Sequence, residues 1–396
     1  MNSQELVQLL HRSCTTGTTA IRSVIRLQPS DGPGGKVFPP TYAEGTYAFE
    51  KRMIDGNRVD CVLLDSVQSQ ANRFEEVLLE AYRSGRLSMP MFEMKVAGHE
   101  ITTLTVPHRV HDAIFRDSIW DGKPFRESEN GKRLVSARAW NATPFFEFAP
   151  TVLLFGTWDS QSGGGVNSAK VARSLVSEII AIDAHRGVRT SSRIDPLGIK
   201  AVGGVVATNG PEMWRFEEAS SDGKRPKKGD GRLRPSEINH GNVAPSITNA
   251  ETGPGGVTFR EALQTTVLSF TQLRKLKFPN GANAGEERDV AGRAVIAALG
   301  LLAIAMNLDE GYQLRSRCQL IPLEQPQFEL LGRTVKEFEV FTADSDTTLG
   351  ALNLALEAAA AQALKWHSGK IELTPRADLE KLVEFSDKVL AAVEGE

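Results

Sequence analysis

The stretch RVDCVLLDSVQSQANRFEEVLLEAYRSG, residues 58–85, contains the change of periodicity that decides the fold. Its first eight residues, 58–65, are largely apolar without regular alternation, which is typical of a buried strand. From residue 66 onward the apolar residues recur at helical spacing: Val67, Phe74, Val77, Leu78 and Ala81. Gly85 is a suitable residue to end that helix. The sequence therefore predicts a buried strand that runs directly into a helix.

The first turns of this predicted helix are unusually rich in amides and hydroxyls. One interpretation is capping by Asp65 or Ser66 beside a solvated helix face. The other is contact with the sugar and phosphate of a nucleic acid, since amide and hydroxyl groups supply many such hydrogen bonds. Under the second interpretation the binding residues are Ser66, Gln68, Ser69, Gln70, Asn72 and Arg73.

A second segment, FGTWDSQSGGGVNSAK at 155–170, follows the apolar run TVLLF at 151–155 and precedes VARSLVSEIIAIDA at 171–184. This pattern predicts a strand, a glycine-rich turn and a helix start. A P-loop needs Lys directly after its last Gly, and a dinucleotide fingerprint needs G-x-G-x-x-G directly after the strand. Neither spacing occurs here, which disfavours a mononucleotide site.

Two interpretations of the glycine-rich turn remain open. It is either a flexible turn before a helix or a grip on the phosphates of a longer chain. For a grip, glycines allow close approach, a serine caps the helix, and two cations share its first turns. Cations beside a helix N-terminus are unfavourable unless an anion binds there. The residues concerned are Gly163, Gly164, Gly165, Ser168, Lys170 and Arg173.

Composition indicates an ordinary soluble protein without a global affinity for polyanions. The net charge is −3, so binding of nucleic acid would have to come from local patches. The three cysteines are far apart, which favours free thiols in a reducing compartment. The N-terminus lacks the order of a signal peptide, and the apolar window 294–306 is short enough to be a buried helix. We therefore expect a cytoplasmic location and no cofactor.

The rest of the chain mixes strands and helices, which predicts an α/β or α+β architecture. Helices are expected at 3–12, with Ser3 as N-cap, and at 257–276, 287–306, 347–366 and 377–393. Strands are expected at 91–106, 199–207, 315–323 and 338–343. The segments 27–47 and 107–148 are loop-rich or mixed. Residues 217–256 cannot supply a core and are expected to form a long, mobile insertion. Within this insertion, residues 222–234 carry a net charge of +4, with Asp222 and Asp230 against six basic residues: Lys224, Arg225, Lys227, Lys228, Arg232 and Arg234.

No set of residues points to catalysis. A G-x-S-x-G elbow is missing from the sequence. His108 and His111 are three apart but lack a third ligand at a recognisable spacing. Asp344 and Asp346 are explained more simply as acidic caps at a helix start.

Several segments together resemble the backbone subunit of type I-G (formerly I-U) CRISPR effector complexes, a member of the RAMP superfamily. The matching stretches are DGPGGKVFPPTY (31–42), VDCVLLDSVQSQANRFEEVLLEAY (59–82), APTVLLFGTWDS (149–160), KVARSLVSEIIAIDA (170–184) and SEINHGNVAPS (236–246). They occur in this order from about residue 28 to 250. We also count Lys36, Trp158, His240 and Asn242, which lie in these stretches, among the RNA-binding candidates.

The resemblance implies a single domain over 1–396 with a ferredoxin-like core related to the RNA-recognition motif. Insertions near 28–57, 107–148 and 217–256 would enlarge it into a hand with palm, fingers and thumb. Several copies would polymerise head-to-tail along the guide RNA, beside a large subunit and a subunit capping the guide's end. The guide would then pair with target DNA in antiviral defence, and the subunit itself would not cleave.

An alternative implied by the same superfamily is a metal-dependent endoribonuclease subunit that cuts target RNA. Relatives of that kind use an aspartate in a loop. Loop aspartates here are Asp31, Asp222 and Asp230.

Overall fold

The structure is a computed structural model of the 396-residue chain. It describes residues 1–159, 170–199, 205–207, 214–216, 235–248, 253–280, 285–334 and 336–394. The described chain divides into two compact units. The first unit comprises Met1–Pro40, Tyr47–His185 and Thr258–Glu380, and the second comprises Thr41–Thr46, Arg186–Val257 and Lys381–Glu396. The predicted insertion at 217–256 falls within the second unit. That the whole chain, 1–396, is a single domain remains a prediction.

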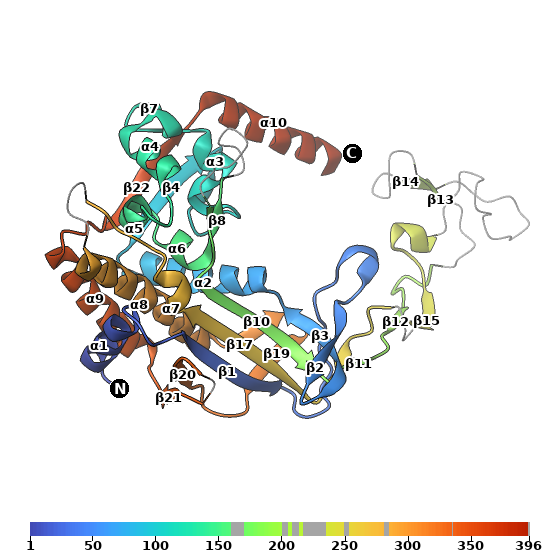
Figure 1. Cartoon of the computed structure of the whole chain (residues 1–396). Helices are drawn as coiled ribbons and strands as arrows, with labels where there is room; N and C mark the ends of the chain where they lie inside the picture. The colour runs from blue at the N-terminus through green and yellow to red at the C-terminus, as the bar shows by residue number, and fades with distance from the viewer. Residues whose placement is uncertain are drawn as a thin grey trace, which may run out of the picture. The chain divides into compact units, whose positions relative to one another are not determined.

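Nine of the described strands form an antiparallel sheet in the first unit (Figure 1). Seven of them lie in the order β18-β19-β1-β17-β10-β3-β2, and β20 pairs with both β1 and β21. Their bounds are β1 Ala20–Pro29, β2 Phe49–Ile54, β3 Asn57–Asp65, β10 Leu175–Ile182, β17 Glu261–Ser269, β18 Tyr312–Arg315, β19 Cys318–Pro322, β20 Phe328–Leu331 and β21 Phe338–Phe341.

The connections within this sheet are those of a ferredoxin-like core. Helix α2 (Val67–Arg83) lies in sequence between β1 and β10, and α8 (Glu286–Glu310) lies between β17 and β19. The spatial order β19-β1-β17-β10 with all neighbours antiparallel is that of a βαββαβ sheet. The β2–β3 hairpin extends the sheet beyond β10. The predicted α+β class with a ferredoxin-like core and insertions is therefore confirmed.

One face of the sheet is covered by helices. Helix α2 packs against β10 and α8, and α8 also contacts β17. In β1 the buried residues Ile21, Ile25 and Leu27 alternate with more exposed ones, as expected for a strand covered on one side. Helix α8 is long and apolar enough to cross a membrane by composition alone, but its apolar window is entirely buried in the fold. It is a core helix, as expected for residues 294–306 and as in a soluble protein.

Among the other helices of the first unit, α1 (Ser3–Ser13), α6 (Thr151–Phe155), α7 (Phe270–Leu273) and α9 (Ser345–Ala361) contact α8. Helices α1 and α9 also contact each other. The remaining short helices are α3 (Ala113–Arg116), α4 (Glu129–Ser136) and α5 (Thr143–Phe148). Helix α10 (Ala377–Glu394) closes the described chain.

A second sheet of the first unit contains five described strands in the order β5-β4-β22-β6-β7. Strand β22 pairs in parallel with β4, although the two lie far apart in sequence. The bounds are β4 Pro90–Val96, β5 His99–Thr102, β6 Ser118–Trp120, β7 Lys123–Pro124 and β22 Gly369–Pro375. A short ribbon of β8 (Thr157–Trp158) and β9 (Lys170–Val171) precedes β10.

In the second unit, β12 (Thr190–Arg193) pairs with β15 (Val243–Ile247), and β13 (Val205–Ala207) pairs with β14 (Trp214–Phe216). Short strands β11 (His185–Arg186) and β16 (Val257–Thr258) lie where the chain enters and leaves this unit. Strand β15 shows that the predicted insertion 217–256 contains regular structure at this point. Its basic stretch, 222–234, lies outside the described residues.

A buried carboxylate joins the end of β3 to the start of α2. The Asp65 side chain has no exposed surface and accepts hydrogen bonds from four side chains. The distances are 2.7 Å from Ser69 Oγ, 2.6 Å from Gln70 Nε2, 2.8 Å from Arg73 Nε and 3.1 Å from Arg315 Nη2. Arg315 comes from β18, so this charge ties together three elements.

The polar network continues through Gln70 into the middle of the sheet. Its Oε1 accepts hydrogen bonds from Ser177 Oγ of β10 at 2.9 Å and from Gln264 Nε2 of β17 at 2.8 Å. The Oε1 of Gln264 in turn accepts from Tyr312 Oη at 2.7 Å. Burying polar groups is favourable only when each is hydrogen-bonded, and this chain of bonds meets that requirement.

Several expected elements differ from those observed. Residues 151–155 form helix α6, not a strand, and 171–184 contain strand β10, not a helix. Residues 257–276 contain the strand β17 and only a short helix at their end. The N-cap of α1 is Asn2 in place of the expected Ser3. The strand at 58–65 and the helices at 66–85, 287–306, 347–366 and 377–393 are confirmed.

We expect Asp65→Ala to lower the free energy of unfolding by about 3–5 kcal/mol, because two cations and a buried amide would lose their shared acceptor. Urea denaturation followed by circular dichroism measures this. Asp60 lies on the same strand as Asp65, and Asp60→Ala removes an exposed ion pair with Lys51 of β2. This variant should cost no more than about 1 kcal/mol. Equal urea midpoints for the two variants would show that the network does not hold the fold.

Candidate nucleic-acid interface

The exposed face of α2 presents a row of polar side chains. Ser66 caps the helix by accepting the backbone N–H of Ser69 at 3.2 Å, which confirms the capping interpretation for this residue. The side chains of Gln68, Asn72, Glu76 and Glu80 are exposed. They are spaced four residues apart and therefore lie on one side of the helix.

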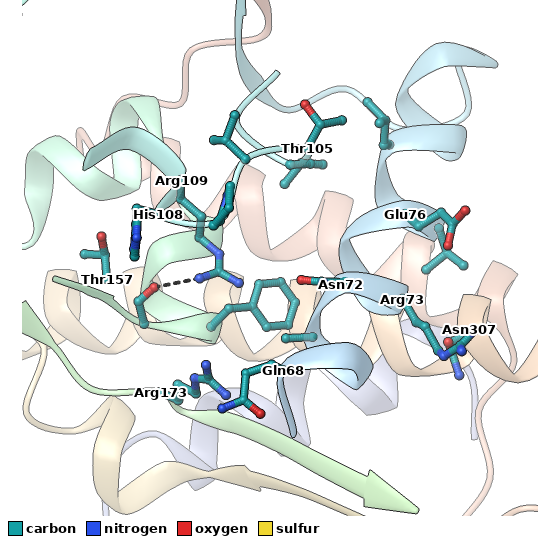
Figure 2. A pocket seen from close by; sticks show the side chains of 18 of the residues that line it. Gln68, Asn72, Arg73, Glu76, Thr105, His108, Arg109, Thr157, Arg173 and Asn307 are labelled. Atoms are coloured by element: carbon teal, nitrogen blue, oxygen red, sulfur yellow. Dashed lines mark hydrogen bonds between the residues drawn. The ribbon is translucent and has the colours of Figure 1, made fainter. Parts of the chain in front are cut away.

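This face of α2 forms part of a cleft of about 1460 Å³ (Figure 2). Residues 104–109, the end of α6, the β8–β9 ribbon and the C-terminal end of α8 complete its lining. In Figure 2, Gln68 and Arg173 lie near each other at one end, and Arg109, His108 and Thr157 lie beside them. The cations of the lining are Arg73, Arg83, Arg109, Lys170 and Arg173, and its anions are Glu76, Glu80 and Glu310.

Two of these arginines are neutralised by buried carboxylates. Arg109 forms a bidentate pair with Glu75, with Nε–Oε1 at 2.6 Å and Nη2–Oε2 at 2.8 Å. Burial raises the pKa of Glu75, and the positive charge of Arg109 opposes that rise. Arg109 also donates to the backbone oxygen of Gly156 at 3.1 Å and lies over the Phe155 ring. Arg73 is held by Asp65 and by the backbone oxygen of Leu314.

Gly156 makes the sharp join between α6 and β8. It has φ of +78°, a region that favours glycine, and a Cβ at this position would lie 3.0 Å from both Arg173 Cγ and the oxygen of Val171. The chain therefore passes directly beside Arg173. The absence of a side chain at Gly156 positions the Arg173 guanidinium in the cleft.

Arg173 differs from its neighbours in forming no ion pair at contact distance with a described residue. Within the described part of the chain it makes no ion pair or hydrogen bond through its side chain, although it is half-buried. Burial, and then the positive charge of Arg109, lower the pKa of the Arg173 guanidinium, and the negative charge of Glu75 opposes this shift. Lys170, on β9, is exposed and also lacks an ion pair among the described residues. The two cations form a positive end of the cleft.

The structure brings together six of the residues predicted from sequence. These residues line the cleft: Gln68, Asn72, Arg73, Trp158, Lys170 and Arg173. Lys170 and Arg173 do not lie on a helix start, because β9 and the turn before β10 replace the expected helix. Ser69 and Gln70 point into the Asp65 network, and Gln70 is only 1% exposed. These two side chains support the fold and do not line the cleft.

Other predicted residues lie elsewhere. Lys36 follows β1 and is not part of the cleft lining. In the second unit the ring of His240 packs against Trp214, and Asn242 Oδ1 accepts the backbone N–H of Asp195 at 2.7 Å. Outside the described residues lie Gly163, Gly164, Gly165, Ser168, Lys224, Arg225, Lys227, Lys228, Arg232 and Arg234.

Sequence reasoning missed Arg109, His108 and Gly156. The spacing of His108 and His111 suggested only a metal pair, so it did not indicate that His108 lines the cleft. Nothing in the local sequence pattern distinguishes Arg109, which lies between them. The described residues contain no group of three or more His, Cys, Asp or Glu that could hold a metal ion. Asp344 caps α9 by accepting the N–H of Thr347, as expected.

The end of the cleft that contains Lys170 and Arg173 has a local positive charge, and such a charge favours anions there. Residues 21–186 match the family described as CRISPR-associated protein GSU0053 (Cas_GSU0053). The match covers less than half of the chain but includes every lining residue of the cleft except Asn307, Glu310, Gly311 and Gln313. This match supports the identification of the chain as a CRISPR-associated protein. No curated protein matches the chain.

We expect Gly156→Ala to lower the free energy of unfolding by about 2–5 kcal/mol, because it adds left-handed strain and a clash with Arg173 and Val171. Gly98→Ala is a matched control, since Gly98 also has positive φ but open space around it. That variant should cost only about 1–2 kcal/mol. Urea midpoints that do not separate the two variants would show that Gly156 is not needed for close approach.

A second prediction concerns His111, whose Nδ1 lies 2.9 Å from Thr157 Oγ1. Burial lowers the pKa of His111 to about 4, with Asp159 opposing and Arg126 and Arg138 adding to the effect. As the pH is lowered from 6.5 to 4, His111 takes up a proton in the unfolded chain but not in the folded protein. The free energy of unfolding therefore decreases as the pH decreases. We expect this residue to account for roughly 2–3 kcal/mol of that loss.

Urea unfolding at several pH values measures the effect. His111→Asn should flatten the acid side of the stability profile, whereas His108→Asn, at an exposed position, should leave it unchanged. Identical profiles for the His111 variant and the wild type would contradict a buried neutral imidazole.

Proposed function

We propose that the protein is the guide-RNA-binding backbone subunit of a CRISPR effector complex, of the type I-G class, and that its cleft binds the RNA without cleaving it. The match to a CRISPR-associated family supports the context. The ferredoxin-like core agrees with the RAMP superfamily fold that the sequence motifs imply. The finer points, guide RNA as ligand and the lack of catalysis, are our proposal.

The observation that carries the proposal is that the half-buried Arg173 forms no ion pair with a described residue. Its neighbours Arg109 and Arg73 are each bound by a buried carboxylate, yet Arg173 is desolvated and forms no ion pair or hydrogen bond through its side chain in the described chain; the nearby Glu75 is already bound by Arg109. A half-buried cation is costly unless an anion completes its environment. A phosphate of the RNA backbone would supply that anion, and Lys170 would add a second contact.

The remaining lining suits a ligand of any sequence. Gln68 and Asn72 donate and accept hydrogen bonds, as contacts to phosphate and 2′-hydroxyl groups require. Glu76, Glu80 and Glu310 make the other part of the lining acidic, so phosphates would be favoured at the end near Arg173. Specificity would then come from base pairing between the guide and target DNA.

Such a subunit would act in several copies. Identical subunits along one RNA require head-to-tail contacts, which extend until a capping subunit ends the row. The partners we propose are the guide RNA, further copies of this chain, and the large and guide-end subunits of the complex, in the cytoplasm.

We expect the double variant Lys170→Ala, Arg173→Ala to bind single-stranded RNA much more weakly. Each lost charge-assisted contact is worth about 1.5–3 kcal/mol, or at least roughly tenfold in affinity. The salt dependence should also become shallower, because fewer counterions are released. Fluorescence anisotropy across a salt series measures both quantities. The melting temperature without RNA should stay the same or rise, since repulsion between Arg173 and Arg109 is relieved.

The matched control is Lys123→Ala, Lys132→Ala, which removes two exposed cations outside the cleft lining. It should leave RNA affinity nearly unchanged. If both double variants bind RNA as well as the wild type, the cleft is not the RNA site. Magnesium-dependent cleavage of the bound RNA by purified protein would instead favour the endoribonuclease alternative.

A further inference from the structure

The tryptophans of the chain divide into packed and unpacked ones. Trp120 packs against three phenylalanine rings, Trp366 against Phe146, and Trp214 against His240. Trp140 and Trp158 are 71% and 59% exposed and make no ring contact among the described residues. Only Trp158 of these two belongs to the cleft lining.

Trp158 is held in its exposed position by buried neighbours on both sides. Thr157 is buried, and its Oγ1 lies 2.9 Å from His111 Nδ1. Asp159 is 1% exposed and pairs with Arg126 Nη2 at 2.8 and 3.0 Å. Two anchored residues therefore fix the backbone of Trp158 while its own indole stays in solvent. An exposed, rigidly positioned aromatic side chain is typical of a binding surface.

The cations of the cleft lie beside this indole. Strand β8 pairs with β9 so that Trp158 is directly opposite Lys170, and Thr157 is opposite Val171. Cross-strand partners have Cβ atoms within about 5.5 Å of each other. Arg173 follows two residues after β9 and lines the same cleft. An aromatic face thus stands next to two cations that form no ion pair with a described residue.

We propose that Trp158 stacks on one nucleobase of the bound RNA, next to the phosphate that Lys170 and Arg173 hold. This inference rests on the proposed function. Stacking uses the flat face of a base, which all four bases possess, and leaves the Watson–Crick edge free. The site would therefore accept any guide sequence and still permit pairing of that base.

The test compares two probes that differ only in their bases. One is a single-stranded oligoribonucleotide of mixed sequence, and the other is an abasic ribose-phosphate chain of equal length. We expect Trp158→Ala to weaken binding of the first probe roughly 5- to 150-fold. Binding of the abasic chain should be unchanged. Trp158→Phe should keep most of the affinity, because it retains an aromatic face.

Trp140→Ala is the matched control, with a similarly exposed indole outside the cleft lining, and it should change neither affinity. Melting temperatures of all variants verify their folding. If Trp158→Ala misfolds, Trp158→Phe still decides the matter. Mixed-sequence RNA should quench the fluorescence of the wild type more than that of Trp158→Phe, and equal quenching would reject stacking.

The outcomes separate this inference from the proposed function. Unchanged RNA affinity in Trp158→Ala, or an equal loss on both probes, would overturn stacking while leaving the cleft as a phosphate site. A wild-type protein that binds neither probe at low salt would overturn the proposed function and stacking together. Two results together would support the proposed function and stacking. The double variant Lys170→Ala, Arg173→Ala should bind both probes more weakly, and Trp158→Ala should bind only the mixed-sequence RNA more weakly.

Discussion

The arrangement of the cleft depends on one buried charge, the carboxylate of Asp65. It sits where β3 ends and α2 begins, and it binds Ser69, Gln70 and Arg73 of the helix. Because all three side chains are bonded to the same buried carboxylate, the helix cannot rotate about its axis without breaking these bonds. Gln68 and Asn72, which lie on a different side of the helix, are then fixed toward the cleft. A polar interaction in the core thus determines which residues face the ligand.

The same helix illustrates how the fold distributes its positive charge. Glu75 and Asp65 each neutralise an arginine that would otherwise add to the field in the cleft. Lys170 on β9 and Arg173 in the turn before β10 form no ion pair among the described residues, and Arg173 lies close to Gly156. The structural arginines and the two cations that we propose to bind RNA are therefore neighbours in the cleft but are distinguished by their partners. A count of basic residues in the sequence could not have made this distinction.

The strand–helix unit at 58–85 could be predicted because its periodicity changes sharply at one residue. The failures have physical causes. In β10, Ile179 and Ala181 are buried under the helices, while Ile180 and Ile182 are buried on the opposite face with Cys61, so alternation is lost and helical spacing appears by chance. In β17, Gln264 and Thr266 occupy covered positions through the polar network, which hides the strand pattern. The cleft was predictable only in part, since Arg109 and Gly156 are brought to it by tertiary contacts.

Strand β2 lies at the edge of the large sheet, where a strand of another copy of the chain would have to pair if the sheets of two copies were to join. Its central residues carry charge in ion pairs: Lys51 with Asp60, and Arg52 with Glu50 and Glu178. Charged side chains along an edge discourage another strand from docking there. A row of copies joined through this edge would have to break those pairs, so the sheets of successive subunits would not merge into one. The spacing of copies would then follow the length of nucleic acid that each one covers, and not the strand spacing of a continuous β-ladder.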